Sequence, residues 1–191
     1  FFYFEDKFGG IKLPKPNLLG TFQLENVSTA ITVSRQLIDY KITNENIKKG
    51  ITKIYSIARL QEIKSGKLKN LVKNNQLFVD GSHNPLGAKV LNQYLKSLNC
   101  EKHIILGMMK NKNHNEYINC FEDIKTLTTI DIPNQPNAIS GNDLKMKIKN
   151  STKIKNKKSI KDAISSLNLE KNDIILITGS LYLAGEVLKI N

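Results

Sequence analysis

The stretch Leu77-Phe78-Val79-Asp80-Gly81-Ser82-His83-Asn84-Pro85 decides the fold of this chain, because it joins an apolar strand to the start of a helix. Its first three residues form a short apolar run of the kind found in the strands of parallel sheets. Asn84 suits the N-cap of a helix, and Pro85 suits the first helical position. After the proline, apolar residues recur at helical spacing: Leu86, Val90, Leu91, Tyr94, Leu95 and Leu98. The stretch therefore predicts a strand, a tight turn and a helix.

The turn at 80–85 is also the first candidate for a functional site. In open α/β sheets, ligands bind at the carboxyl ends of the strands, which is where Asp80 and His83 are expected. An acid, an imidazole and the free backbone N–H groups of a helix start can together hold phosphate, sugar hydroxyls or a carboxylate. The alternative is that Asp80 only caps the turn and His83 is a surface residue. The convergence of three polar features at one strand end favours a functional site.

Strands and helices are expected to alternate from residue 77 to the last residue. This alternation predicts an α/β fold with a mostly parallel, Rossmann-like sheet flanked by helices. Further strands are expected at 103–109, 127–132 and 173–178, and further helices at 115–124, 142–148, 160–167 and 181–190. Ser140 is the expected cap of the helix over 142–148.

The region before residue 77 is expected to be organised differently. Residues 10–20 begin and end with glycine, contain Pro14 and Pro16, and predict a connector. Helices are expected at 23–40 and 44–55, and a hairpin with Gly66 in its turn is expected over 59–72. A boundary near 56–58 predicts two domains, 1–57 and 58–191.

Length and composition are those of an ordinary globular protein. The chain has 191 residues, of which 40% are hydrophobic and 24% are charged. No apolar run approaches the roughly 20 residues that a membrane-spanning helix needs. The first residues lack an initiating Met and do not resemble a signal peptide, so we expect a fragment of a longer protein. Two cysteines provide no disulfide framework, which favours a cytoplasmic location.

The net charge of +12 raises the question of nucleic-acid binding. Almost all the positive residues are lysines spread along the whole chain, and Arg35 and Arg59 are the only arginines. The densest run of lysines, at 153–158, contains no aromatic residue on which a base could stack. This distribution favours a solvated lysine-rich surface over a nucleic-acid interface.

Three further segments are candidates for anion binding. Arg59 lies beside the expected domain boundary, where its planar fork would suit a phosphate, although it could equally be an isolated arginine with no special role. Gly179-Ser180 follows the last expected strand and would face the same sheet edge as Asp80. The loop at 107–113 carries Lys110 and Lys112, which could reach an anion.

The sequence contains no standard metal-binding motif and no standard nucleotide-binding motif. Cys100, His103, His114 and Cys120 have no standard zinc spacing, so no metal ligand is expected in this chain. There is no G-x-x-x-x-G-K-[ST] and no G-x-G-x-x-G, so the chain has no phosphate-binding loop of its own.

Six motifs occur in a fixed order along the chain: Leu13-Pro14-Lys15-Pro16, Gly20-x-x-Gln23-x-x-Asn26 with Thr29-Ala30, Ala58-Arg59-Leu60-Gln61, Asp80-Gly81-Ser82-His83-Asn84-Pro85, Gly107-Met108-Met109 with Lys112, and Gly179-Ser180-Leu181-Tyr182-Leu183-Ala184-Gly185-Glu186-Val187. Together they resemble the C-terminal part of the folylpolyglutamate synthase/dihydrofolate synthase family, within the Mur ligase superfamily. The resemblance covers essentially the whole chain. It implies that residues 1–57 are the tail of a central ATP-binding domain and that 58–191 form a Mur-ligase-type C-terminal domain.

The resemblance also implies a reaction. Enzymes of this family use ATP and Mg²⁺ to phosphorylate the carboxylate of dihydropteroate or a folate, and the amine of L-glutamate then displaces phosphate. The phosphate-binding loop and the magnesium ligands of the family lie upstream of this chain, so the fragment alone is expected to be inactive. A monomer that binds neither nucleic acid nor membranes is expected.

Position by position, the resemblance assigns roles to residues of this chain. Asn26, Arg59 and Asp80 match nucleotide-contacting positions, and His83 and Ser180 match positions associated with glutamate. His83 is the candidate catalytic residue. The alternatives are another amide ligase of the same superfamily, acting on peptidoglycan or cyanophycin precursors, or a non-catalytic basic module that binds nucleic acid.

Overall fold

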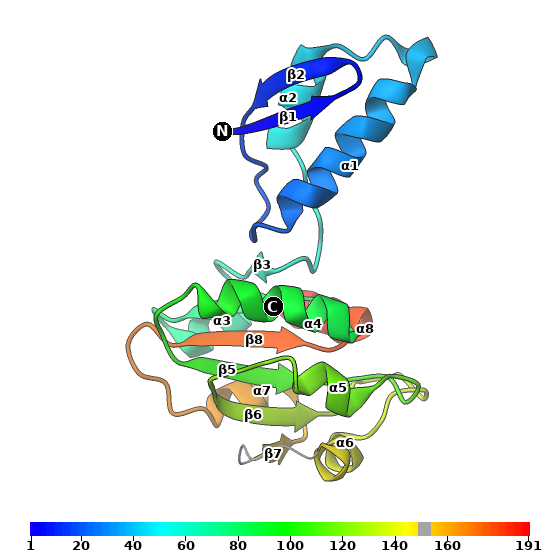
Figure 1. Cartoon of the computed structure of the whole chain (residues 1–191). Helices are drawn as coiled ribbons and strands as arrows, with labels where there is room; N and C mark the ends of the chain where they lie inside the picture. The colour runs from blue at the N-terminus through cyan, green and yellow to red at the C-terminus, as the bar shows by residue number, and fades with distance from the viewer. Residues whose placement is uncertain (149–153) are drawn as a thin grey trace. The chain divides into compact units, whose positions relative to one another are not determined.

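The computed structural model describes residues 1–148 and 154–191. The chain divides into two compact units, Phe1–Ile57 and Ala58–Asn191 (Figure 1). Within these described residues, the helices are all too short or too polar to cross a membrane.

The first unit packs a hairpin against helices. Strands β1 (Phe2–Asp6) and β2 (Gly9–Leu13) pair antiparallel, and α1 (Gln23–Gln36), the short 3₁₀ helix η1 (Ile38–Tyr40) and α2 (Asn44–Thr52) follow. Buried apolar residues from β1, β2, α1 and α2 form one core: Phe4, Ile11, Leu13, Val27, Ile31, Ile47 and Ile51. An isolated two-stranded hairpin is only marginally stable in water, so its packing against the helices stabilises it.

Three sequence expectations for this unit need correction. The predicted connector at 10–20 is wrong in its first part, because β2 occupies Gly9–Leu13. Its inward residues alternate with exposed ones, a strand pattern that the neighbouring glycines and prolines obscured in the sequence. The first helix ends at Gln36 rather than at residue 40, because Leu37 leaves the helical conformation. The second helix ends at Thr52 rather than at residue 55.

The second unit confirms the predicted α/β fold. In its described residues, six strands form one sheet in the order β3-β4-β8-β5-β6-β7. Neighbours from β4 to β7 are parallel, and only β3, at the edge, runs antiparallel. The strands are β3 (Gln61–Glu62), β4 (Gln76–Val79), β5 (Lys102–Leu106), β6 (Ile124–Ile130), β7 (Ile154–Lys157) and β8 (Ile174–Thr178).

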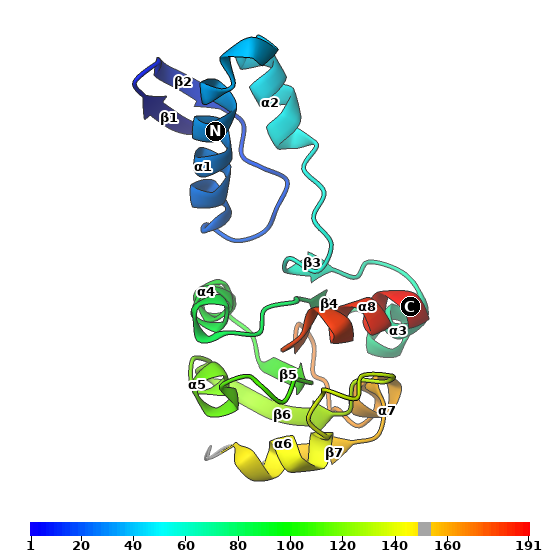
Figure 2. The same ribbon diagram turned by 90° about the vertical axis from the view of Figure 1, so that its right-hand side faces the viewer.

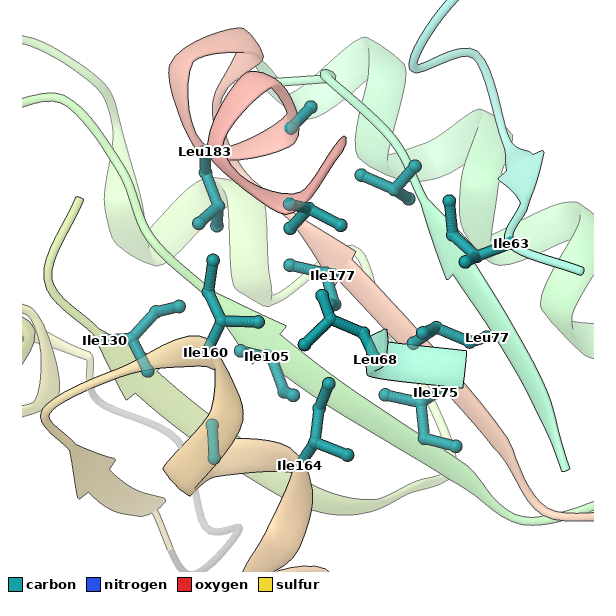
Figure 3. Packing of buried hydrophobic residues seen from close by; sticks show 14 of the residues in the cluster. Ile63, Leu68, Leu77, Ile105, Ile130, Ile160, Ile164, Ile175, Ile177 and Leu183 are labelled. Atoms are coloured by element: carbon teal, nitrogen blue, oxygen red, sulfur yellow. The ribbon is translucent and has the colours of Figure 1, made fainter. Parts of the chain in front are cut away.

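Helices cover both faces of this sheet, as Figure 2 shows. On one face lie α4 (Pro85–Lys96), α5 (His114–Ile118) and α6 (Gly141–Lys147), and on the other lie α3 (Lys67–Val72), α7 (Ile160–Ser165) and α8 (Leu181–Ile190). The side chains of the central strand β8 alternate between the two resulting cores, so all of its residues are buried. Figure 3 shows Ile175 and Ile177 of this strand packed among residues of α3, α7 and α8. Burial on both faces explains the continuous apolar sequence of β8.

The predicted hairpin over 59–72 is wrong. Residues Lys67–Val72 form helix α3, in which Leu68 and Val72, four positions apart, are both buried. Gly66 precedes this helix with φ +107°, a conformation that favours glycine. The strand at Gln61–Glu62 pairs instead with β4.

The lysine-rich run at 153–158 is partly a strand, β7, that pairs with β6. Lys153 lies outside the described residues. The charged side chains of the run had concealed the strand, which lies at the end of the sheet order and has two of its four residues exposed.

Candidate functional site

The carboxyl edge of the second unit's sheet gathers most of the predicted site residues. The turn at 80–85 follows β4, Gly179-Ser180 follows β8, and Gly107 follows β5. These are neighbouring strands in the order β4-β8-β5, so their ends lie side by side. Helices α4 and α8 both begin at this edge, with Asn84 and Ser180 as their N-caps.

Asp80 is buried at this edge, with 3% of its surface exposed. Its Oδ2 accepts a hydrogen bond of 2.7 Å from the Leu60 N–H, and its Oδ1 accepts one of 2.7 Å from the Ser82 N–H. Burial raises the pKa of the Asp80 carboxyl above its usual value, although hydrogen bonds from Ser82 and Leu60 and the charge of Arg59 oppose this shift. The carboxylate therefore ties the turn to the segment around Arg59.

Arg59 projects from a constrained segment, 58–60. Ala58 and Leu60, on either side of it, have φ values of +55° and +45°, which are uncommon for residues with a side chain. The segment is fixed to the turn, because Gly81 donates a hydrogen bond of 2.8 Å to the carbonyl of Ala58 and Leu60 donates to Asp80. Arg59 itself is exposed and has no hydrogen bond or ion pair among the described residues. Its guanidinium is free to bind an anion.

His83 is half-buried at the start of α4. Its Nδ1 lies 3.3 Å from the carbonyl oxygen of Gly81, and this contact is a hydrogen bond when Nδ1 carries the proton. In that tautomer Nε2 is an acceptor, with no hydrogen bond to it in the described residues. Asn84 caps the helix by accepting a hydrogen bond of 2.9 Å from Gly87, and Pro85 occupies the first turn, as predicted. The contact with the Gly81 carbonyl holds the ring, and Nε2 is left for a bound molecule.

Ser180 is held between the ends of β8 and α8. Its Oγ accepts a hydrogen bond of 3.1 Å from the Tyr182 N–H, and only 2% of the residue is exposed. Gly179 has φ +107°, and a Cβ at this position would lie 2.7 Å from the Gly107 carbonyl oxygen. Gly179 also donates a hydrogen bond of 3.1 Å to the Ser82 carbonyl. Glycine is therefore required where the two strand ends approach each other.

The structure brings Arg59, Asp80, His83 and Ser180 to one edge of the second unit. Asn26 belongs to the first unit, on α1, where it is exposed and donates a hydrogen bond of 3.0 Å to Gln23 Oε1.

The two lysines of the 107–113 loop differ in their contacts. Lys110 donates a hydrogen bond of 3.0 Å to the carbonyl of Pro136, so its ammonium is partly occupied. Lys112 is half-buried in the same loop and has no such contact in the described residues. Of the two, Lys112 has the charge more available for an anion.

The residues considered as zinc ligands do not form a metal site. No cluster of three or more His, Cys, Asp or Glu side chains in the described parts of the chain could hold a metal ion. His103 lies at the amino edge of the sheet, where its Nε2 is 3.1 Å from Asp173 Oδ2 and its Nδ1 is 2.8 Å from Thr126 Oγ1. His114 Nε2 bonds the Met109 carbonyl at 3.0 Å. Both histidines are thus satisfied by structural hydrogen bonds.

Some residues that support the site were not predicted from the sequence. Leu60 acts through its backbone N–H, which no side-chain motif can reveal. Tyr117 and Thr178 place buried hydroxyls beside Ser82 of the turn, and the sequence predicted only that Tyr117 lies in a helix and Thr178 in a strand. A hydroxyl at the end of the otherwise aliphatic strand Ile174–Thr178, next to Gly179-Ser180, was the signal available for Thr178.

The fold and the edge define the class of this chain: a parallel α/β domain whose strand ends present a buried carboxylate, a free guanidinium and an imidazole. Residues 58–181 match the family model described as Mur ligase, glutamate ligase domain. The chain belongs to this family.

Relatives of known sequence and structure extend the likeness to the whole chain. The folylpolyglutamate synthase of Lacticaseibacillus casei is 28% identical over 192 residues, which cover 97% of this chain and 42% of that protein. The bifunctional folylpolyglutamate synthase/dihydrofolate synthase of Yersinia pestis CO92 has the same fold, with a TM-score of 0.78 at 18% identity over 98% of this chain and 43% of its own.

Two structures with bound nucleotides share this fold. The Y. pestis enzyme complexed with AMPPNP and Mn ion gives a TM-score of 0.75 at 18% identity over 94% of this chain and 41% of its own. Mycobacterium tuberculosis folylpolyglutamate synthase complexed with ADP and AMPPCP gives 0.76 at 20% identity over 95% of this chain and 42% of its own. The chain therefore spans about two fifths of the length of these relatives.

Proposed function

We propose that this chain is the C-terminal part of an ATP-dependent ligase that adds L-glutamate to dihydropteroate, to folates or to both. Residues 1–57 would be the tail of a central ATP-binding domain, and residues 58–191 the domain that closes the nucleotide site and receives the amino acid. The family match and the likeness to folylpolyglutamate synthases over nearly the whole chain support this proposal.

The proposed reaction has two steps. The γ-phosphoryl group of ATP passes to an oxygen of the folate or pteroate carboxylate, and ADP leaves. The amine nitrogen of glutamate then attacks the carbonyl carbon of the acyl phosphate, inorganic phosphate leaves, and the nitrogen loses a proton as the amide forms. Phosphorylation makes the carboxylate oxygen a good leaving group, so the protein mainly has to position reactants and stabilise charge.

Each site residue has a proposed role. Arg59 would bind the phosphates, because its free guanidinium matches phosphate oxygens in charge and geometry. Asp80 would help to fix the nucleotide from this domain and holds Leu60, next to Arg59, in place. Asn26 would contact the nucleotide from the first unit. His83 and Ser180 would bind glutamate, and His83 Nε2 would accept the proton that the amine loses.

One observation carries the proposal: hydrogen bonds join the three segments of the second unit that bear Arg59, the turn at 80–85 and Ser180. The Leu60 N–H to Asp80 Oδ2 bond joins the Arg59 segment to the turn, and the Gly179 N–H to Ser82 O bond joins the turn to the Ser180 segment. A guanidinium suited to phosphate and an imidazole with a free nitrogen are thereby anchored to one rigid framework. That arrangement fits a reaction in which a phosphorylated carboxylate meets an amine.

The divalent metal of the reaction is proposed to be Mg²⁺, with its ligands upstream of residue 1. The residues described here do not fit a metal site, so no step of the reaction is assigned to metal ligands in this chain. The proposed partners are ATP, L-glutamate and dihydropteroate or a folate. A cytoplasmic monomer that binds neither nucleic acid nor membranes completes the proposal.

The test is a substrate comparison with the longer protein that carries this chain and its upstream sequence. ATP hydrolysis and amide formation are measured with glutamate and either dihydropteroate or a folate, and in parallel with peptidoglycan and cyanophycin precursors. We expect glutamate addition only with the pteridine substrates, and none by residues 1–191 alone. Ligation to a peptidoglycan or cyanophycin precursor, or activity of the isolated chain, would contradict the proposal.

A further inference from the structure

Three hydroxyl groups meet beneath the turn at 80–85 and form what we call the hydroxyl cluster: Ser82 Oγ, Tyr117 Oη and Thr178 Oγ1. Tyr117 Oη lies 2.8 Å from Ser82 Oγ and 2.7 Å from Thr178 Oγ1, and it also donates a hydrogen bond of 3.2 Å to the Ser82 carbonyl oxygen. The two smaller hydroxyls lie 3.4 Å apart. The phenol is therefore the centre of the cluster.

The members of the cluster come from distant parts of the chain. Tyr117 lies on α5, Thr178 is the last residue of β8, and Ser82 lies in the turn after β4. All three are buried, and Tyr117 has no exposed surface at all. The cluster thus joins two strand ends of the site to a helix that carries none of the proposed substrate-binding residues.

One assignment of protons satisfies every polar atom in the cluster. The Tyr117 hydroxyl donates to the Ser82 carbonyl, and the hydroxyls of Ser82 and Thr178 both donate to Tyr117 Oη. Burial raises the pKa of the Tyr117 phenol far above its usual value, which outweighs the opposing hydrogen bonds from Ser82 and Thr178. Tyr117 therefore stays neutral at physiological pH, and its part in the site is to hold other groups in place.

The cluster acts on the two segments that are proposed to bind glutamate. Ser82 is followed directly by His83, and Thr178 is separated from Ser180 by Gly179 alone. Asp80, in contrast, has a second anchor outside the cluster, the N–H of Leu60. Loss of the phenol hydroxyl would loosen the spacing of His83 and Ser180 more than the position of Asp80.

We propose that Tyr117 is a positioning residue that sets the spacing between His83 and Ser180 for the incoming amino acid, an inference that rests on the ligase function proposed above. It touches no substrate and acts through the turn and the end of β8. Without the phenol oxygen, the hydroxyls of Ser82 and Thr178 keep, among the described residues, only their long 3.4 Å contact with each other. Because poorly paired buried hydroxyls are costly, both segments can then shift.

The test uses the longer protein with the Tyr117→Phe substitution, which removes one oxygen and keeps the ring. We expect the KM for glutamate to rise by roughly tenfold, the loss expected when about 1.4 kcal/mol of binding free energy disappears, while the KM for ATP changes less than about twofold. Thr178→Val, which removes the second hydroxyl at similar volume, should reproduce this split, and Thr178→Ser, which retains it, should restore the KM.

Tyr94→Phe is the matched control. Tyr94 is a half-buried phenol on α4 that packs edge-on against Phe78, and no bond from its hydroxyl to the turn is present in the described residues. This substitution should leave both KM values unchanged. Amide hydrogen exchange provides a second measurement, because Gly179 donates to the Ser82 carbonyl and should exchange faster in Tyr117→Phe than in Tyr94→Phe.

The outcomes separate the two proposals. An active Tyr117→Phe protein with an unchanged KM for glutamate, or with both KM values raised equally, overturns the positioning role and leaves the ligase function standing. Unchanged exchange at Gly179 also overturns it. A wild-type protein that adds no glutamate overturns the ligase function, and the positioning role falls with it.

Discussion

The two edges of the large sheet both bury an aspartate, but they satisfy it in different ways. At the amino edge, Asp173 accepts hydrogen bonds from His103 and from the Glu170 N–H, and the ammonium of Lys125 lies 3.6 Å away. At the carboxyl edge, Asp80 accepts from two backbone N–H groups instead. Arg59, the cation whose charge acts on Asp80, is exposed and unpaired among the described residues.

This difference separates a structural edge from a candidate functional one. Side-chain partners at the amino edge neutralise one another, which leaves little for a ligand to recognise. Backbone partners at the carboxyl edge keep Asp80 in place and leave the guanidinium of Arg59 and Nε2 of His83 available. Both edges hold buried polar groups, so burial alone would not have told them apart.

The largest effect is expected when the exposed cation at the carboxyl edge, the guanidinium of Arg59, is removed. Arg59→Ala in the longer protein should lower kcat/KM for ATP by roughly 100-fold, because the charge proposed to bind the phosphates is lost. The unfolding midpoint should hardly change, since Arg59 is exposed. Lys64→Ala removes another exposed cation and is the control, expected to leave kcat/KM for ATP unchanged. A similar loss in both variants would show that Arg59 contributes only general charge.

The second largest effect is expected at the amino edge, where the carboxylate of Asp173 is replaced by an amide. Asp173→Asn should lower the free energy of unfolding of the chain at pH 7 by about 2 kcal/mol, because His103 and the Glu170 amide lose a charged acceptor. Burial opposes ionisation of Asp173, but hydrogen bonds from Glu170 and His103, with the charge of Lys125, hold its pKa below the usual value. Its stabilisation is therefore lost as the pH falls through that lowered pKa, and urea titrations should show the deficit of the variant shrinking below about pH 4.

The matched substitution at the other edge, Asp80→Asn, should have a smaller effect at neutral pH, about 1 kcal/mol. The amide can accept from only one of the two N–H groups, but the cost of burying a charge is also removed. Because the pKa of Asp80 is raised in the folded state, wild type binds a proton more readily when folded and gains stability as the pH falls through that raised value. The deficit of Asp80→Asn should thus grow on acidification, opposite to Asp173→Asn. Parallel pH slopes for the two variants would contradict this contrast.

The smallest effect concerns a residue between the two edges. Thr128 Oγ1, in the middle of β6, is buried with no hydrogen-bond partner among the described residues. Thr128→Val replaces this hydroxyl by a methyl group and should raise the free energy of unfolding by roughly 0.5–1 kcal/mol in urea denaturation. Thr126→Val, which removes the partner of His103, is the comparison and should be destabilising.

The sequence predicted the sheet best where local signals and burial agree. The apolar run of β8 and the Asn84-Pro85 helix start are local features, and both elements appear as expected. The segment at 67–72 was misread because two leucines and a valine after a glycine suit a strand or a helix equally. Only packing of Leu68 and Val72 against the core decides for the helix.

Prediction of the candidate site was limited in the same way, by contacts that form only when the chain is folded. Asp80, His83 and Ser180 could be recognised because they sit at strand ends with helix caps. The contributions of Leu60 and Tyr117 depend on contacts between residues far apart in the chain, such as the 35-residue separation between Ser82 and Tyr117. A single sequence carries no record of such pairs.

The position of β8 has a consequence for how the protein forms. This strand follows the other five in the sequence, yet it lies between β4 and β5, which have no ladder with each other. A ribosome therefore completes the flanking strands while the centre of the sheet is still missing, and the backbone N–H and C=O groups along their inner edges stay unpaired until β8 is made. Closing the sheet requires contacts over long separations, such as Val79 with Ile177, which slows folding. Insertion of β8 between β4 and β5 thus completes the core, and the same event brings Ser180 beside the turn at 80–85.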